Sequence, residues 1–169
     1  MSEKKETSNS YRGGQFLTFR LEDEIFGVPI GTVREVLDCV PVTRVPGAVE
    51  FLKGVINLRG AVVPVADMRI KFGMQATMQT ADSCIIVVEV EGSDEEGKKT
   101  VGVMADQVLE VADIAEPDMQ MHPDMGTGIP SRYLRGLGKI GGKSFMALNI
   151  DAIISDNMKK SIPPSEGEG

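Results

Sequence analysis

Histidine, cysteine and aromatic residues are scarce in this chain of 169 residues. The single histidine, His122, has no second histidine with which to form a multi-histidine metal site, and no catalytic triad can be assembled around it from sequence. Tryptophan is absent and aromatic residues make up only 5%, so a surface that stacks nucleobases is disfavoured. Cys39 and Cys84 lie far apart, and we interpret both as small buried thiols in a reducing cytosol.

Positive charge and long apolar runs are also lacking. Lys and Arg number 18 against 25 Asp and Glu, which gives a net charge of −7. An acidic chain without a basic stripe is a poor candidate for binding nucleic acid or anionic lipid, because cations supply most of that affinity. The uninterrupted apolar runs, such as Cys84 to Val88, are strand-sized, and the polar start predicts no signal peptide.

The residues that are abundant point to a mainly β protein. Hydrophobic residues make up 41% of the chain, and Val, Ile and Leu dominate the apolar runs. Four runs are predicted to be strands: Gln15 to Leu21, Ile25 to Ile30, Cys84 to Val90 and Thr100 to Ala105. The last two should form a hairpin, with the charged segment Glu91 to Lys99 as its solvated loop.

The chain ends are polar and of a different composition. Residues 1–14 and 161–169 are expected to be disordered tails on either side of one domain, residues 15–160. One helix is predicted near the end of that domain, over Asp151 to Lys160, with Asp151 as its N-cap.

An internal repeat organises the domain. The segment "GVPIGTVREVLD" at 27–38 matches "GVMADQVLEVAD" at 102–113, an offset of 75 residues (102 − 27). The segment "FLKGVINLRGAVV" at 51–63 matches "YLRGLGKIGGKSF" at 133–145, an offset of 82 (133 − 51). Duplication and convergence on one β pattern both explain the matches. Either origin predicts two similar small β modules that pack against each other, because each alone is too short to bury a generous core.

Two apparent nucleotide motifs fall inside the second repeat. Gly136, Gly138 and Gly141 match G-x-G-x-x-G, and "GGKS" at 141–144 resembles the end of a P-loop. Both motifs need a helix directly after the glycines, whereas "SFMALNI" predicts a strand. We therefore interpret these glycines as hairpin residues, and no cofactor or metal site is predicted.

A methionine-rich segment precedes this hairpin. Met119, Met121 and Met125 either form an adaptable binding surface or fill gaps beneath a long loop, and we favour the second interpretation.

Arg59 occupies a turn where Asn or Asp would be usual. Arg59 and Gly60 form a two-residue loop in which Leu58 opposes Ala61 and Asn57 opposes Val62, with Gly60 at positive φ. Arg59 then points outward, either as a solvated charge that discourages edge pairing or as a contact for a partner. If strand pairing brings Glu35 near Arg59, the two would form a charge-assisted pair that orients the tip.

The segment "GVINLRGAVVPVADMR" resembles the CheW family of chemotaxis coupling proteins. The resemblance extends through "FLTFRLEDEIFGVPIGTVREVLD", "TVGVMADQVLEV" and "YLRGLGKIGGKSFMALNID", and covers the chain from about Gln15 to Lys160. It implies two interlocked five-stranded SH3-like β-barrels that share a core, with a C-terminal helix. Two features depart from the family pattern: the long acidic loop at 91–99, and Met68 in place of the usual aliphatic Leu.

The resemblance also implies a function without catalysis, cofactor or metal. The protein would be a cytoplasmic adaptor, recruited to membrane-associated arrays, that couples chemoreceptor tips to the regulatory domain of the histidine kinase CheA. The implied kinase and receptor coupling positions are Glu35, Gly54, Asn57 and Arg59. The positions implied for the groove that takes the receptor hairpin are Val33, Ile85, Gly102 and Val111. The alternative is a β-barrel that binds oligosaccharide or nucleic acid, which the charge and the scarcity of aromatic residues disfavour.

Overall fold

The computed structural model describes residues 13–38, 40–48, 50–75, 80–91, 97–115 and 129–157. Several sequence predictions fall outside these residues: residues 1–12 of the first tail, all of 161–169, residues 158–160 of the predicted last helix, the centre of the 91–99 loop, Cys39, His122 and the methionines at 119, 121 and 125. Cys84 is within them and is buried, as predicted. Among the described residues, no helix is both long and apolar enough to span a membrane.

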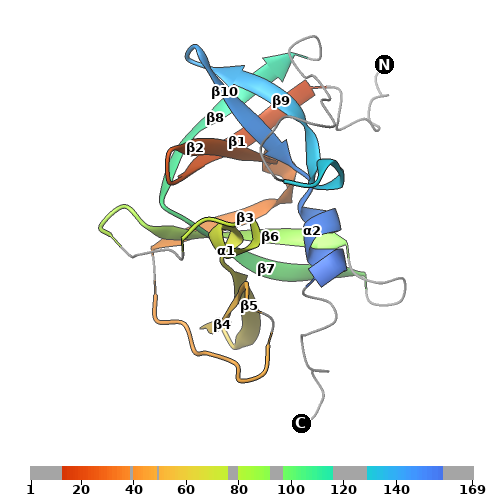
Figure 1. Cartoon of the computed structure of the whole chain (residues 1–169). Coiled ribbons are helices and arrows are strands. Elements are labelled where there is room, and N and C mark those ends of the chain that lie inside the picture. Colours follow the sequence, from red (N-terminus) through yellow and green to blue (C-terminus); the bar gives the residue numbers. More distant parts are fainter. Residues whose placement is uncertain are drawn as a thin grey trace.

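In the described part of the chain, ten strands form two five-stranded sheets, which lie one above the other in Figure 1. Sheet A has the order β8-β1-β2-β10-β9. Its strands are β1 (Gly13–Leu21), β2 (Glu24–Pro29), β8 (Gln107–Ala115), β9 (Leu134–Ile140) and β10 (Lys143–Leu148). Sheet B has the order β3-β6-β7-β5-β4. Its strands are β3 (Val33–Asp38), β4 (Leu52–Leu58), β5 (Ala61–Ala66), β6 (Cys84–Glu91) and β7 (Lys98–Ala105).

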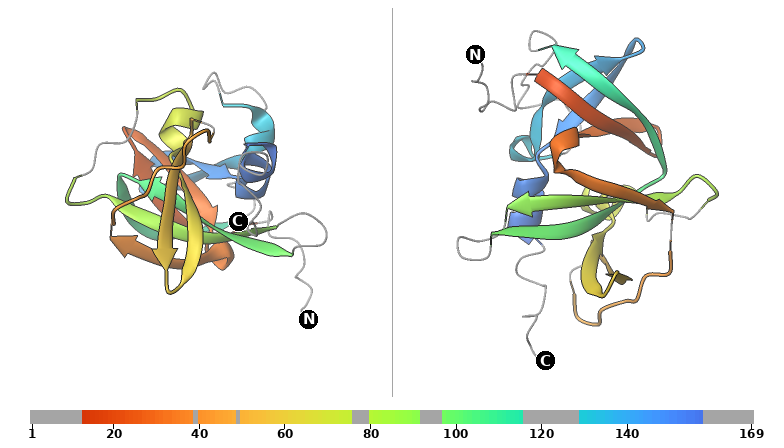
Figure 2. Two further views of the ribbon diagram at one scale, coloured as in Figure 1. Left: turned by 90° about the horizontal axis from the view of Figure 1, so that it is seen from below. Right: turned by 180° about the vertical axis from the view of Figure 1, so that it is seen from behind.

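Four short helical segments complete the described structure. They are η3 (Ile30–Thr32), α1 (Met68–Lys71), η5 (Ser131–Tyr133) and α2 (Ile150–Asn157). The helix α1 follows β5 of sheet B, and α2 follows β10 of sheet A, so each sheet's last hairpin leads into one helix. Figure 2 shows from two further sides that α2 runs alongside the junction of the sheets.

The two sheets exchange strands. The chain leaves sheet A after β2 and enters sheet B at β3, and it leaves sheet B after β7 and enters sheet A at β8. If β1–β5 are matched with β6–β10, the two sheet orders become identical. The parallel pairings agree as well, since Ala147 pairs with Gly27 in sheet A and Val65 pairs with Gly102 in sheet B. The predicted pair of interlocked modules is therefore confirmed, and each module is built from both halves of the chain.

Each sheet curls until its edges meet. In sheet B, the segment after β3 returns to β4, where Thr43 and Val55 exchange two backbone hydrogen bonds of 2.8 Å. In sheet A, the edge strands β8 and β9 contact each other. This closure agrees with the SH3-like barrels that the family resemblance implies.

The buried side chains lie in three layers. We call the barrel formed by sheet A barrel A and the barrel formed by sheet B barrel B. Phe16 and Phe145 pack inside barrel A, and Ile85 and Val87 pack inside barrel B. Between the barrels lies a larger shared core to which both sheets and α2 contribute. The strand β6, which lies between β3 and β7, is buried on both faces, because Ile86 and Val88 face the shared core and Ile85 and Val87 face the inside of barrel B. Burial on both faces explains why its sequence is a continuous apolar run rather than an alternating one.

Two sequence predictions differ in detail from the structure. The strand β1 begins at Gly13, two residues inside the predicted tail, because Gly13 and Gly14 pair with β8. The predicted N-cap of the last helix, Asp151, is wrong. Asn149 caps α2 by accepting a hydrogen bond of 3.1 Å from the Ala152 N–H, and Asp151 instead accepts one of 2.9 Å from the Glu91 N–H.

Candidate functional site

Arg59 lies at the tip of the β4–β5 hairpin, in the register that the sequence predicts. Leu58 pairs with Ala61 and Asn57 pairs with Val62. Arg59 and Gly60 both have positive φ, 52° and 88°, which is the pattern of a two-residue hairpin turn whose twist matches the flanking strands. The Asn57 side-chain oxygen accepts a hydrogen bond of 3.1 Å from the Gly60 N–H and so stabilises the turn.

The equivalent turn in the second repeat contains no charged residue. Gly141 and Gly142 form the tip of the β9–β10 hairpin with φ of 56° and 82°, almost the same backbone as Arg59 and Gly60. A non-glycine residue at this φ is unfavourable by about 1–3 kcal/mol, which the glycine avoids. Arg59 is therefore placed where the turn alone would favour glycine.

Glu35 on β3 forms an ion pair with Arg59, as the sequence analysis expected. The Arg59 side chain is 70% exposed and that of Glu35 is 27% exposed. Because β3 lies at one edge of sheet B and the β4–β5 hairpin at the other, the pair spans the closure of the barrel. Solvent screening limits its contribution to stability to about 1 kcal/mol or less. The pair orients an exposed guanidinium more than it stabilises the fold.

Gly54, another implied coupling position, is buried inside the closure of barrel B. A Cβ atom at residue 54 would collide with the Thr43 carbonyl, whose carbon would be 2.7 Å away, and would meet Val42 Cγ1 at 2.8 Å. Gly54 also has φ of 155°. The absence of a side chain allows the segment after β3 to reach β4, so Gly54 has a packing role in this structure.

The four groove positions do not form one surface. Ile85 is fully buried and Gly102 is buried beside it in barrel B. Val33 is half-buried against the shared core, and Val111 is 45% exposed on the edge strand β8 of sheet A. The expectation that Ile85 lines a groove directly therefore needs correction: Ile85 and Gly102 present no surface and can act only through packing.

Gly102→Ala is expected to lower the free energy of unfolding by about 1–3 kcal/mol, because the added Cβ would lie 2.8 Å from Ile85 Cγ2. Urea unfolding measures this loss. In the double variant Gly102→Ala/Ile85→Ala, the collision is absent, so its loss should be smaller than the sum of the two single losses. An unfolding free energy equal to that of the wild type would contradict the prediction.

Three exposed apolar side chains were not predicted from the sequence. Val62 is 67% exposed, Val36 is 45% exposed and Leu109 is 37% exposed. Val62 is on the β4–β5 hairpin that carries Arg59. Val36 follows Glu35 in β3 and lies on the opposite face of that strand. The alternation along "VREVLD" could have identified Val36, since Arg34, Val36 and Asp38 share the exposed face of β3.

The described residues include a pocket but no cluster of metal-ligating side chains. They contain no group of three or more His, Cys, Asp or Glu placed to hold a metal ion. A pocket of 420 Å³ lies between the 44–50 segment and α1. Its lining mixes the cations Arg44 and Lys53 with the anions Glu50 and Asp67. This lining has no formal charge preference for a ligand.

Comparison with known proteins gives consistent matches over most of the chain. The family model described as "CheW-like domain" matches residues 15–158. "Chemotaxis protein CheW" of Klebsiella aerogenes is 31% identical over 156 residues, covering 88% of this chain and 90% of that protein. The protein of the same name from Rhizobium meliloti is 31% identical over 149 residues, covering 88% and 92%.

One solved structure and one differently named relative extend the comparison. The crystal structure of the scaffolding protein TtCheW from Thermoanaerobacter tengcongensis is similar to this chain, with a TM-score of 0.75 and 28% identity. The match covers 91% of this chain and 94% of that one. "Protein FrzA" of Myxococcus xanthus is 28% identical, covering 88% of this chain and 89% of that protein.

Proposed function

The chain belongs to the CheW-like domain family, and on this premise we propose that it links chemoreceptor tips to the regulatory domain of the histidine kinase CheA. As a member of a scaffold family, it is a non-catalytic adaptor of chemotaxis signalling. Neither the family nor the charge of −7 favours the alternative of an oligosaccharide- or nucleic-acid-binding barrel.

The Arg59–Glu35 pair is the observation that supports a coupling role for barrel B. An exposed arginine is held in place by a carboxylate, on a turn that would be satisfied by glycine. Exposed apolar side chains, Val36 and Val62, belong to the same two elements. Arginine is among the residues that most often dominate binding energy at protein interfaces.

The receptor would contact a second surface, which includes Val111. Its exposed apolar side chain would pack against a receptor hairpin. Val33, half-buried against the shared core, and the buried Ile85 and Gly102 would act by supporting the fold from within. In this proposal, residues 15–160 act as a single coupling domain between tails 1–14 and 161–169. It would work in the cytoplasm and be recruited to receptor arrays at the membrane.

Binding measured separately and together tests the proposal. The full chain is titrated with a receptor-tip fragment, with the kinase regulatory domain, and with each in the presence of a saturating amount of the other. An adaptor binds both at once, so each affinity should persist when the second partner is present. Strict competition between the two would contradict coupling, and retention on nucleic acid without kinase binding would support the alternative barrel function.

A further inference from the structure

Arg69 ends the distinctive segment "VVPVADMR", and the proposed coupling surfaces leave it without a role. Its side chain is only 11% exposed. All three guanidinium nitrogens donate hydrogen bonds. Nε donates to the Gln75 carbonyl at 2.8 Å, Nη1 to both carboxylate oxygens of Asp106 at 3.0 Å, and Nη2 to Glu22 Oε2 at 3.0 Å. A planar guanidinium held on three sides in this way has one orientation.

The two carboxylates belong to different parts of the fold from Arg69. Arg69 lies on α1, which continues from β5 of sheet B, whereas Glu22 lies in the β1–β2 turn of sheet A. Asp106 is the residue between β7 and β8, where the chain crosses from sheet B to sheet A. Arg69 thus joins the helix of one barrel to the turn of the other and to the crossover between them.

The carboxylates of Asp106 and Glu22 are also held in place by hydrogen bonds to the backbone, independently of Arg69. Asp106 Oδ2 accepts a hydrogen bond of 2.6 Å from the Glu22 N–H, and the Asp106 N–H donates to the Arg20 carbonyl at 2.9 Å. The Gln75 N–H donates to Glu22 Oε2 at 3.3 Å, so the segment after α1 contacts the same turn. The two carboxylates therefore form a preorganised binding site for the guanidinium. The side chain of Asp106 is only 13% exposed.

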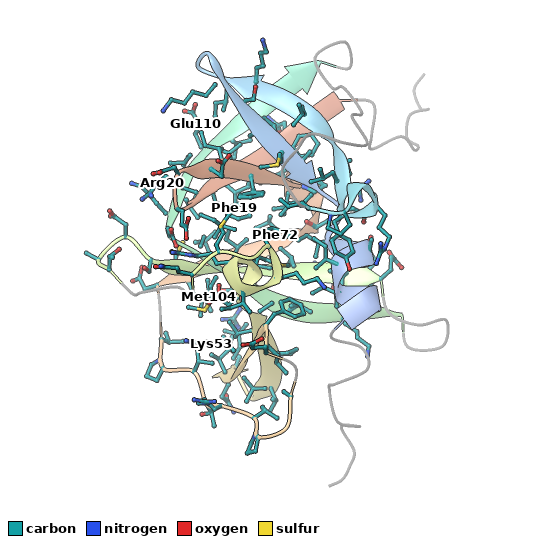
Figure 3. All side chains as sticks on the ribbon, viewed as in Figure 1. Phe19, Arg20, Lys53, Phe72, Met104 and Glu110 are labelled. Atoms are coloured by element: carbon teal, nitrogen blue, oxygen red, sulfur yellow. The ribbon has the colours of Figure 1, made fainter. Side chains whose placement is uncertain are left out.

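Apolar contacts bring α1 to the same junction. Phe72, the residue after α1, stacks on Phe26 of β2 with ring centroids 5.4 Å apart, and Phe26 stacks on Phe19 at 6.1 Å. Figure 3 shows Phe19 and Phe72 in the layer between the two sheets. Lys71 Nζ lies 5.4 Å from the centroid of the Tyr133 ring. Burial of apolar rings is non-directional, whereas charge-assisted hydrogen bonds from one guanidinium to several acceptors fix its direction.

The second helix, α2, makes a corresponding contact with sheet B, through a hydrogen bond to the backbone rather than an ion pair. At the 82-residue offset, Asp151 of α2 corresponds to Arg69 of α1 (151 − 69). Asp151 accepts one hydrogen bond of 2.9 Å from the Glu91 backbone, at the end of β6. Both helices thus contact the first hairpin of the opposite sheet. The Arg69 cluster adds two carboxylates to that shared contact.

We propose that Arg69 is a positioning residue that sets the relative orientation of the two barrels. Arg59 and Glu35 are on barrel B and Val111 is on barrel A, so this orientation sets the spacing between the two coupling surfaces. That consequence rests on the proposed function. The orientation itself does not.

The test compares Arg69→Gln with Arg34→Gln. Arg34 also pairs with a glutamate, Glu89 at 3.3 Å, but both residues are within sheet B, so its loss removes a charge and an ion pair without affecting the junction. Residual dipolar couplings of the full-length protein are fitted separately for the strands of each sheet. One alignment tensor should describe both sheets in the wild type and in Arg34→Gln, and two different tensors should be needed in Arg69→Gln.

Coupling is measured in parallel, as kinase activation in reconstituted receptor arrays corrected for the folded fraction. We expect a loss of about fivefold or more for Arg69→Gln relative to the wild type, typical of coupling between sites. Arg69→Lys keeps the charge but not the planar guanidinium that reaches Gln75, Asp106 and Glu22 at once, and should give an intermediate loss. If Arg69→Gln does not fold, Glu22→Gln, which removes one arm of the cluster, is expected to separate the tensors.

A single tensor in both Arg69→Gln and Glu22→Gln would overturn the proposal. A change in orientation that leaves activation unaltered would confirm the role of Arg69 in orientation and overturn its consequence for coupling. A wild-type protein that fails to activate the kinase would overturn the proposed function instead, and the tensors would still decide the role of Arg69.

Discussion

Arg59→Glu is expected to reduce kinase activation in reconstituted receptor arrays by about tenfold or more, the range for an arginine that dominates an interface. The melting temperature should fall by no more than about 4 °C, because an exposed ion pair contributes about 1 kcal/mol or less. Both expectations follow from one geometry. The guanidinium is 70% exposed, and the turn that carries it needs no charge, since Gly141 and Gly142 adopt almost the same backbone.

Arg59→Gly separates loss of activation from loss of stability more clearly than Arg59→Glu does. It gives the first hairpin the Gly-Gly turn of the second and removes a non-glycine residue from φ of 52°, so the fold should be at least as stable as the wild type. Activation should nevertheless fall about as far as in Arg59→Glu. Loss of activity in a protein that is equally or more stable cannot be attributed to damage to the barrel.

The charge swap Arg59→Glu/Glu35→Arg separates the ion pair from the partner contact. It restores opposite charges across the barrel closure, and we expect it to recover any lost stability but not activation. Recovery of activation would mean that the pair acts only by orienting the tip. Unchanged activation in Arg59→Glu would refute the coupling role, and a large drop in its melting temperature would make Arg59 a structural residue.

Gly54→Ala is expected to lower the free energy of unfolding by about 3 kcal/mol or more, at the upper end of the range for overpacking. The new Cβ would collide with the backbone carbonyl of Thr43 rather than with the end of a flexible side chain. Relief would require the segment after β3 to move away, which would break the paired hydrogen bonds between Thr43 and Val55. Closure of barrel B would then be lost.

Gly31→Ala is the matched control, because a Cβ at residue 31 would have no heavy atom within 4 Å. Urea unfolding of both variants, followed by circular dichroism, should show a lower midpoint for Gly54→Ala and little change for Gly31→Ala. Equal midpoints would contradict the packing role of Gly54. If Gly54→Ala also fails to activate the kinase, this stability loss identifies the cause as an opened barrel and not a missing partner contact.

The local features of the fold could be predicted from the sequence. The β4–β5 register, the positive φ of Gly60 and the hairpin character of the glycines at 136, 138 and 141 all proved correct. Turn chemistry acts over a few residues and is legible in a short segment. The positive φ of Arg59 was not predicted, because positive φ was assigned only to Gly60, whereas this type of turn needs it at both central residues.

Burial at individual positions was harder to predict. Ile85 and Val111 both look like apolar strand residues, yet one is fully buried and the other is 45% exposed. The identity of a single apolar residue does not say whether its face of the strand meets a second layer. In a protein with three buried layers, a strand such as β6 is covered on both sides and a strand such as β8 is not.

The sequence by itself determined the family, the two repeated β modules, their hairpins and the residues at each turn, because all of these depend on neighbours along the chain. Only the tertiary structure decided which sheet each strand joins. The strand β3 does not join the sheet of β1 and β2, and β8 does not join the sheet of β6 and β7. It also decided the role of Arg69, whose carboxylate partners are 37 and 47 residues away along the chain. Contacts at such separations form only when both barrels pack together, so no local pattern encodes them.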